Sequence, residues 1–439
     1  MITIDNDSKF TIVVKLGSSS IVDEDTREPR IANITRLVEA LVKLRRDGHR
    51  IVLVSSGAIA MGLNETKLAK KPKRLAAKQA LAALGQGKLI SLFDNMFRYF
   101  NQQTAQILLT RNDIVDFSQF KNAESTLFEL LNMGIIPIVN ENDTISTQEI
   151  KFGDNDTLSA ITAGMVNADY LFLLTDVDCL YTDNPRVNSN AKKVLVVKNL
   201  ANLNVNTKGG AGTSVGTGGM ETKLIAADLA TNAGVTTIIC NSNSPENIIN
   251  IVQYSHEVDK DFRYSEDDKL LTFEENADQF DENNLEEAKR LQEFNIPLHT
   301  RFIGQPKQQV KNKQFWLLHG LKPKGSLIVD YGCFLAITRQ NRAGLLPVGI
   351  LKVEGNFSQL ECVEIKLAVK SEENKAVTFG RGRCNYSSSE IDKIKGLKSD
   401  EISNILEYWD SEYVVHRENL AFPNHFDSEV INFINQHFQ

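Results

Sequence analysis

The 439-residue sequence contains no run of 18 apolar residues, which argues against a transmembrane helix. Its first ten residues carry two aspartates and no apolar stretch, so we expect neither a signal peptide nor a transit peptide. Cysteine is scarce, and the five cysteines lie far apart without a C-x-x-C pair. We therefore expect neither a disulfide framework nor a structural zinc site, and we predict a reduced, cytoplasmic protein without a membrane partner.

The sequence also has no large excess of positive or negative charge, and it contains few histidines. The 49 Lys+Arg and 56 Asp+Glu residues give a net charge of −7, which argues against a protein that mainly coats nucleic acid. None of the seven histidines is spaced to pair with a nucleophile or a metal ligand, so histidine catalysis is disfavoured. The phosphate-binding motif G-x-x-x-x-G-K-[ST] does not occur at any useful position either.

What is present is a long alternation of strands and helices. The length suggests two or three domains, and 42% apolar residues suffice for large cores. The expected strands are 11–16, 50–55, 104–109, 135–140, 169–175 and 236–241, and the expected helices are 31–47, 74–100, 118–132, 156–167 and 220–233. Because the strands are almost continuously apolar, we predict a three-layer α/β/α sandwich with a mostly parallel sheet. Ligands should bind at the carboxyl ends of its strands.

Two further parts follow this first domain, which we place at residues 1–256. Residues 257–293 hold 14 acidic and five basic residues, so we predict that 257–310 form an acidic insertion or linker, in which 285–294 would suit a short amphipathic helix. Residues 311–439 are predicted to form a small, mainly β domain with one helix near 387–395. Its expected strands are 326–329, 334–337, 349–353, 362–368, 376–379 and 413–416.

Small and polar residues follow several of the expected strands. Lys15 closes the first strand before Gly-Ser-Ser-Ser, which would cradle a phosphate; a lysine that reaches solvent before a flexible loop is the alternative. Ser56 lies in a Ser-Ser-Gly turn, which suits either a ligand or only a tight turn. The polar run from Asn140 to Asp143 could bind an amine and a carboxylate, or form an Asx-rich turn.

Three more segments carry candidate residues. Residues 154–156 (Asp-Asn-Asp) open a helix that needs only one of them as its N-cap, so the others would face a ligand or position cations. Thr175 and Asp176 end a strand where an adenine or a ribose could be held. Residues 209–223 contain six glycines and lead into a helix, which is the geometry of an anion site, with a linker as the alternative.

These segments bring two lysines, Lys15 and Lys223, and several Asp and Asn residues to one edge of the sheet. No Ser–His, Cys–His or metal-ligand set accompanies them. Two lysines beside a polyanion site fit phosphoryl transfer, in which catalysis is mainly positioning and charge neutralisation.

The motifs also occur in the order found in a known family. Residues 13–18 (VVKLGS), 55–59 (SSGAI), 139–143 (VNEND), 151–159 (KFGDNDTLS) and 216–223 (GTGGMETK) closely resemble the glutamate 5-kinase family of the amino-acid kinase superfamily. The chain beyond residue 345 resembles the PUA domain appended to that family, a fold otherwise known from RNA-modifying proteins. The resemblance covers nearly the whole chain except the acidic stretch at 257–293.

The resemblance implies phosphorylation of the γ-carboxylate of L-glutamate by ATP with Mg²⁺, the first step of proline biosynthesis. It places Lys15 and Lys223 beside the transferred phosphoryl group, with Asp156 organising both lysines. It places Ser56, Asp143 and Asn155 at the glutamate. The residues that it implies for ATP are Lys15, Thr175, Asp176, Thr217, Gly218, Gly219, Met220, Glu221, Thr222 and Lys223. It implies no dedicated protein ligand for the metal, because Mg²⁺ that bridges phosphates needs few.

The remaining expectations concern regulation, partners and two alternative functions. The resemblance implies inhibition by proline, a homo-oligomer and contact with the reductase that consumes glutamyl phosphate. One alternative is a related kinase for N-acetylglutamate or aspartate, against which the PUA-like domain speaks. Another is an RNA-binding protein, but residues 301–439 hold 18 basic and 16 acidic residues, and this balance argues against RNA as a partner.

Overall fold

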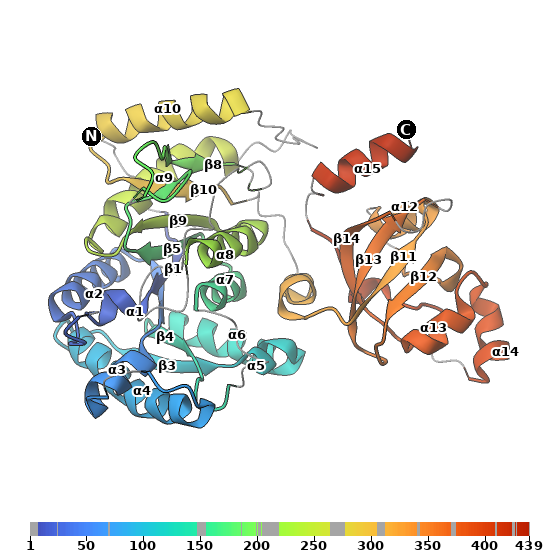
Figure 1. The fold of residues 1–439 in the computed structure, drawn as a ribbon, viewed down its shortest axis with the longest axis horizontal. Helices are drawn as coiled ribbons and strands as arrows, with labels where there is room; N and C mark the ends of the chain where they lie inside the picture. The colour runs from blue at the N-terminus through green and yellow to red at the C-terminus, as the bar shows by residue number, and fades with distance from the viewer. Residues whose placement is uncertain are drawn as a thin grey trace. The chain divides into compact units, whose positions relative to one another are not determined.

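The computed structural model describes residues 8–23, 25–68, 71–146, 155–185, 187–198, 200, 203, 219–263, 277–304, 312–339, 343–369, 375–408, 411–423, 426 and 428–438. The chain divides into two compact units, residues 1–307 and 308–439, and each has its own hydrophobic core (Figure 1). Within the described ranges, no helix is both long and apolar enough to cross a membrane.

A mostly parallel sheet forms the centre of the first unit. Its strands are β1 (Thr11–Leu16), β2 (Arg50–Ser55), β3 (Thr104–Leu109), β4 (Ile136–Glu141), β5 (Tyr170–Thr175), β8 (Val196–Val197), β9 (Thr236–Asn241) and β10 (His299–Phe302). They are ordered β3-β4-β2-β1-β5-β9-β10-β8. Neighbours from β3 to β9 run parallel, whereas β10 is antiparallel to β9 and parallel to β8. The short strands β6 (Leu180–Tyr181) and β7 (Lys193–Val194) form a separate antiparallel pair.

Helices cover both faces of this sheet, as predicted. They are α1 (Ser18–Ile21), α2 (Ile31–Arg46), α3 (Ala58–Thr66), α4 (Leu75–Arg98), α5 (Arg111–Val115), α6 (Phe117–Asn132), α7 (Asn155–Met165), α8 (Met220–Asn232), α9 (Asn247–Arg263) and α10 (Ala277–Glu293). Figure 1 shows α2 on one side of β1 and β5, with α7 and α8 on the other. Side-chain caps fix some helix starts: the carboxylate of Asp116, for example, accepts a hydrogen bond from the backbone N–H of Gln119 where α6 begins.

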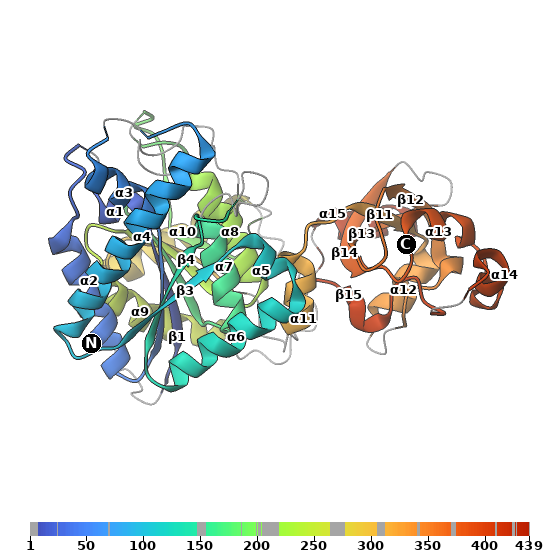
Figure 2. The ribbon, with the colours of Figure 1, turned by 90° about the horizontal axis from the view of Figure 1, so that it is seen from below.

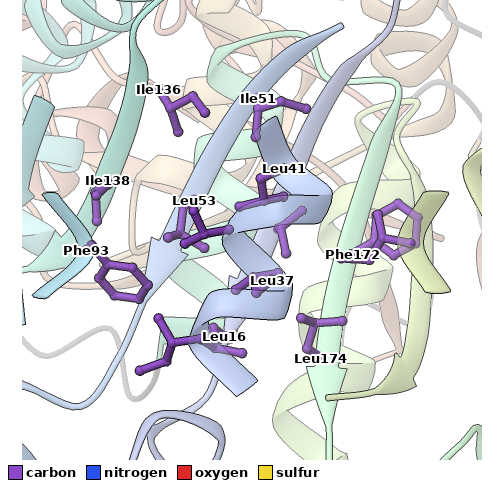
Figure 3. Close-up of a cluster of buried hydrophobic side chains, with 14 of the residues drawn as sticks. Leu16, Leu37, Leu41, Ile51, Leu53, Phe93, Ile136, Ile138, Phe172 and Leu174 are labelled. Atoms are coloured by element: carbon purple, nitrogen blue, oxygen red, sulfur yellow. The ribbon is translucent and has the colours of Figure 1, made fainter. Parts of the chain in front are cut away.

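Alternate residues of β1 serve the two helical layers, because successive side chains of a strand point to opposite faces. Ile12, Val14 and Leu16 are fully buried in the core beneath α2 and α4. Figure 3 shows Leu37 and Leu41 of α2 packed over this face. The side chains between them, including that of Lys15, face the layer that contains α7 and α8.

The predicted linker is corrected by the structure. Where residues 257–310 are described, they belong to the first unit: α9 ends at Arg263, α10 covers 277–293, and β10 pairs with β9. Guanidinium Nη2 of Arg301 in β10 lies 3.0 Å from Oε1 of Glu287 in α10, and both side chains are buried. The remainder of 257–310 lies outside the described residues.

The short amphipathic helix predicted at 285–294 lies largely within α10. The acidic composition hid the rest of this helix and its packing, because an acidic helix needs only a narrow stripe of buried residues. In α10 the buried positions include Asn284, Glu287 and Leu291, three and four residues apart, while the residues between them are exposed or half-buried. The boundary between the two units accordingly lies at residue 307 rather than at 256 or 310.

The second unit is built on a mixed five-stranded sheet, ordered β12-β11-β13-β14-β15. Its strands are β11 (Gly325–Val329), β12 (Ile350–Gly355), β13 (Cys362–Ala368), β14 (Ala376–Arg383) and β15 (Leu420–Ala421). Its helical segments are α11 (Asn312–Phe315), the π-helix η2 (Trp316–Gly320), α12 (Tyr331–Thr338), η3 (Pro347–Gly349), α13 (Ser388–Ile394), η4 (Ser399–Glu401), α14 (Ile402–Leu406), η5 (Arg417–Asn419) and α15 (Ser428–Phe438).

Two strand predictions in this unit were wrong. Residues 334–337 lie in α12, because the carboxylate of Asp330 accepts a hydrogen bond from the N–H of Cys333 and starts a helix. Phe334 and Ile337, three residues apart, then bury their side chains on one helix face. Within 413–416, Val415 forms only an isolated bridge with Leu345.

Helices α3 and α4 lie side by side in both ribbon views (Figures 1 and 2), and two glycines set their separation. A Cβ at Gly85 of α4 would lie 1.8 Å from the carbonyl oxygen of Ala58 in α3. A Cβ at Gly62 of α3 would lie 2.1 Å from the carbonyl oxygen of Leu81 in α4. Any side chain at either position would therefore push the two backbones apart.

This close approach generates the first prediction. Gly85→Ala should lower the free energy of unfolding by about 1–3 kcal/mol, because the added methyl group overpacks the contact with Ala58. Urea denaturation followed by circular dichroism would measure the change.

Gly87 provides the matched control on the same helix. It is exposed, and a Cβ there would have no neighbour within 4 Å. Gly87→Ala should raise stability by about 0.5–1 kcal/mol, since alanine favours the helix interior. Equal stabilities for the two variants would contradict the assigned role of Gly85.

Candidate active site

The carboxyl ends of four neighbouring strands, β4, β2, β1 and β5, meet at one edge of the first unit's sheet. Lys15 is the fifth residue of the six in β1, Ser56 follows β2, and Thr175 ends β5. Helix α7, which packs on these strands, begins with Asn155 and Asp156. The topology therefore brings together residues that lie far apart in the sequence.

Asp156 lies between two lysines. Its Oδ1 is 2.5 Å from Nζ of Lys15, and its Oδ2 is 3.1 Å from Nζ of Lys223 in the first turn of α8. Oδ2 also accepts a hydrogen bond of 2.9 Å from the hydroxyl of Thr222. Lys15 is 6% exposed, Lys223 7% and Asp156 0%, so all three charges are withdrawn from bulk water.

The carboxylate of Asp156 is held in its ionised form. Burial by itself raises the pKa of Asp156, but the positive charges of Lys15 and Lys223 outweigh that effect. Hydrogen bonds from Lys15 and Thr222 act in the same direction as the two charges. The pKa of Asp156 therefore lies well below its ordinary value of 3.8, and the group carries its negative charge at neutral pH.

A second group of side chains, which we call the Asn155 cluster, lies next to the triad of Lys15, Asp156 and Lys223. The amide Nδ2 of Asn155 donates to the hydroxyl of Ser56 at 2.9 Å, to the carbonyl oxygen of Ser55 at 3.3 Å and to Oδ1 of Asn140 at 3.0 Å. The structure thus confirms that Ser56 and Asn155 come together. Because the hydroxyl of Ser56 receives this bond, its own proton remains available for an acceptor such as a carboxylate.

Sequence reasoning missed one member of this cluster, Gln86, and predicted another, Asn140, only as part of a polar run without a role of its own. Asn140 is the penultimate residue of β4, and Gln86 lies 54 residues earlier on α4 and accepts a hydrogen bond of 2.7 Å from Nδ2 of Asn140. Beside them, Glu141 accepts a hydrogen bond of 2.6 Å from Ser146. The signal for Asn140 was its place at the end of a strand, whereas nothing in the sequence marks Gln86 beyond its glycine neighbours.

Asp143, the third predicted substrate residue, lies in the turn after β4. Its backbone N–H donates to the carbonyl oxygen of Glu141 at 2.9 Å, and its side chain is half-buried. The assignment of Asp143 to the substrate stays a prediction.

The described residues predicted for ATP at β5 and α8 lie at the carboxyl end of β5 and at the amino end of α8. Thr175 is 9% exposed and donates to Oδ1 of Asp176 at 3.2 Å. Gly219 immediately precedes α8, whose first four residues are Met220, Glu221, Thr222 and Lys223. Thr217 and Gly218 lie outside the described residues. The positive end of the α8 dipole, together with Lys223, favours an anion at this place.

The chemistry available here is electrostatic. Within the described ranges, no group of three or more His, Cys, Asp or Glu side chains is arranged to hold a metal ion. None of the contacts in the triad or the Asn155 cluster involves a histidine. The described residues of the site supply fixed positive charge and hydrogen bonds.

Comparison with known families agrees with this site. The Amino acid kinase family matches residues 10–241, which include the triad and the Asn155 cluster. The PUA domain family matches residues 325–406 in the second unit. The chain belongs to the amino acid kinase family and carries a C-terminal PUA domain, as the sequence motifs predicted.

Curated relatives narrow the similarity further. The chain is 52% identical to "Probable glutamate 5-kinase" of Schizosaccharomyces pombe, and the match covers 96% of each chain. It is 42% identical to "Glutamate 5-kinase" of Rippkaea orientalis, over 94% of this chain and 99% of the relative. It is also 42% identical to "Glutamate 5-kinase" of Acaryochloris marina, over 94% of this chain and 98% of the relative.

The triad generates the second prediction. Asp156→Asn leaves two buried lysines without their counter-charge, so the free energy of unfolding at pH 7 should fall by about 3–5 kcal/mol. Because the folded-state pKa of Asp156 lies below 3.8, its contribution is complete above about pH 4 and is lost as the pH falls further. Urea denaturation from pH 7 to pH 3 should show a weaker acid dependence in the variant.

Asp281→Asn is the control, because Asp281 forms an exposed ion pair with Lys192 at 3.4 Å. Its removal should change stability little. If Asp156→Asn were as stable as Asp281→Asn at pH 7, the buried triad would not hold the site together.

Proposed function

We propose that the protein transfers the γ-phosphoryl group of ATP to the γ-carboxylate of L-glutamate and forms L-glutamyl 5-phosphate, the first step of proline biosynthesis. The observation that carries the proposal is the pair of buried lysines on one aspartate. Two positive charges and one negative charge leave a net charge of +1 away from water, and a phosphoryl group is the anion that balances it.

The proposed mechanism places the phosphoryl group in flight between Lys15 and Lys223. Both lysines neutralise charge on the non-bridging oxygens, while Asp156 holds their Nζ atoms in position. The attacking γ-carboxylate has an ordinary pKa near 4.3 and is already ionised at pH 7. Catalysis therefore requires no general base, in keeping with the absence of histidine from the triad and the Asn155 cluster.

The two substrates are proposed to bind on either side of the start of α7. Glutamate would contact Ser56, Asp143 and Asn155, and ATP would contact Thr175, Asp176 and residues 217–223. Mg²⁺ would enter with ATP, where residues 217–223 are proposed to hold the nucleotide, and would supply positive charge that neutralises the phosphates.

Regulation and partners are part of the same proposal. Proline carries the α-carboxylate and amine of glutamate within a ring, so a site shaped for glutamate would accept it as a feedback inhibitor. The acyl phosphate product is labile, which favours direct transfer to a glutamyl-phosphate reductase. Assembly of a homo-oligomer is proposed from the resemblance to the family alone.

RNA binding by the PUA domain is not favoured by the arginines near its sheet. Arg381 donates through Nη1 to the carbonyl oxygens of Leu318 and Leu321, and so caps η2. Arg383 donates to the carbonyl oxygen of Leu360 and lies 5.4 Å from the ring of Trp316. Both side chains thus have partners within the second unit.

The third prediction tests the proposed activity. Purified protein with ATP, Mg²⁺ and hydroxylamine should convert L-glutamate, but neither aspartate nor N-acetylglutamate, into a coloured hydroxamate. Lys223→Met should lower kcat about 10²–10³-fold, because it removes one of the two charges on the transferred group.

Lys192→Met, which removes an exposed lysine near α10, should keep full activity. Product from aspartate or N-acetylglutamate alone would retain phosphoryl transfer and replace the proposed substrate. Absence of product with all three acceptors would refute the proposed function.

A further inference from the structure

The half-buried Gln86 of α4 has no role in the mechanism above, yet a chain of side-chain amides connects it to the site. Its Oε1 accepts a hydrogen bond from Nδ2 of Asn140 at 2.7 Å. Oδ1 of Asn140 accepts one from Nδ2 of Asn155 at 3.0 Å. Asn155 is adjacent to Asp156, so the chain ends where the two substrates are proposed to meet.

Two backbone groups determine which way these amides point. The N–H of Glu141, which can only donate, contacts Oδ1 of Asn140 at 2.9 Å, so Nδ2 of Asn140 is the atom that faces Gln86. The carbonyl oxygen of Ser55, which can only accept, contacts Nδ2 of Asn155 at 3.3 Å. Oδ1 of Asn155 is therefore the amide atom that is not used by Ser55, Ser56 or Asn140.

Oδ1 of Asn155 is buried and receives no hydrogen bond from the residues that the structure describes. A buried acceptor of this kind is unfavourable unless a ligand provides a donor. The two carboxylates of an ionised dicarboxylic amino acid only accept hydrogen bonds, and its ammonium group only donates them. The α-ammonium group is the part of such a substrate that fits Oδ1.

We propose that Gln86 is a positioning residue that acts through Asn140 to hold Oδ1 of Asn155 as the acceptor for the α-ammonium group of the substrate. The inference rests on the proposed function and deepens it, since it assigns one atom of the site to one group of glutamate. The adjacent Gly85 supports the role, because its contact with Ala58 fixes the distance of α4 from the start of α3, which directly follows β2.

The experiment compares glutamate with glutarate, which has both carboxylates and no amino group. Gln86→Met keeps the length of the side chain and removes the acceptor for Asn140. It should raise the KM for glutamate about tenfold, with the KM for ATP within about twofold of the wild-type value. The inhibition constant of glutarate against glutamate should stay within about twofold, because glutarate has no group for Oδ1 of Asn155.

Two further variants test the assignment. Gln86→Glu keeps an acceptor for Nδ2 of Asn140 and should restore the KM for glutamate to within about threefold of wild type. Lys88→Met alters an exposed residue of the same helix, paired with Glu65, and should leave all constants unchanged. Equal losses for glutamate and glutarate in Gln86→Met would overturn the proposal, since Gln86 would then only support the fold.

A second readout separates this proposal from the proposed function. If wild-type protein phosphorylates no amino acid, the proposed function fails. The role of Gln86 can then still be tested by NMR, through the hydrogen exchange of the side-chain amide of Asn155. Its protons should exchange slowly with water in the wild type and at least about tenfold faster in Gln86→Met. Equal exchange in the two proteins would overturn the positioning role as well.

Discussion

The attraction between one buried carboxylate and two buried ammonium groups is the interaction on which the site depends. Lys15 lies inside a sheet strand and Lys223 lies in the first turn of α8, and both side chains are buried, which is unfavourable for an isolated charge. The negative charge of Asp156 stabilises both buried ammonium groups. It also holds the two Nζ atoms at the edge of the sheet, where they attract a polyanion. The same carboxylate thereby links α7 to α8, while the second lysine leaves the site with one positive charge in excess.

In the proposed mechanism, the start of α7 serves the two substrates through consecutive residues. Successive side chains on a helix point about 100° apart, so Asn155 and Asp156 face different neighbours. Asn155 contacts the ends of β2 and β4, whereas Asp156 contacts β1 and α8. A single helix terminus thus sets the position of the amino-acid acceptor relative to the phosphoryl donor, and a shift of α7 would move both together.

Much of the first unit could be predicted because buried parallel strands and amphipathic helices have clear local patterns. Lys15, Asp156 and Lys223 were found in the same way, as polar residues at the ends of such elements. Gln86 and its contact with Asn140 were not, because that contact depends on how α4 packs against α3, which the glycine contacts determine and no local pattern shows. The acidic helix α10 was predicted only in its second half, at 285–294, and the strand β10 was missed, because net charge says nothing about one buried stripe. Helix α12 was mistaken for a strand because four apolar residues have no readable period, and the cap at Asp330 decided the outcome.

The strand order also has a consequence for how the chain is made. β1 is synthesised first, but one of its two neighbours in the sheet is β5, which follows more than 150 residues later. A nascent chain therefore carries β1 without its neighbour β5, and without α7 and α8 over one face, for much of the synthesis of the first unit. The anion site cannot exist before residue 223 has left the ribosome, so shorter nascent chains have neither the activity nor the ion pairs that stabilise it. Contacts of such long sequence separation form slowly, so the edge of β1 that pairs with β5 stays open until late in the folding of the first unit.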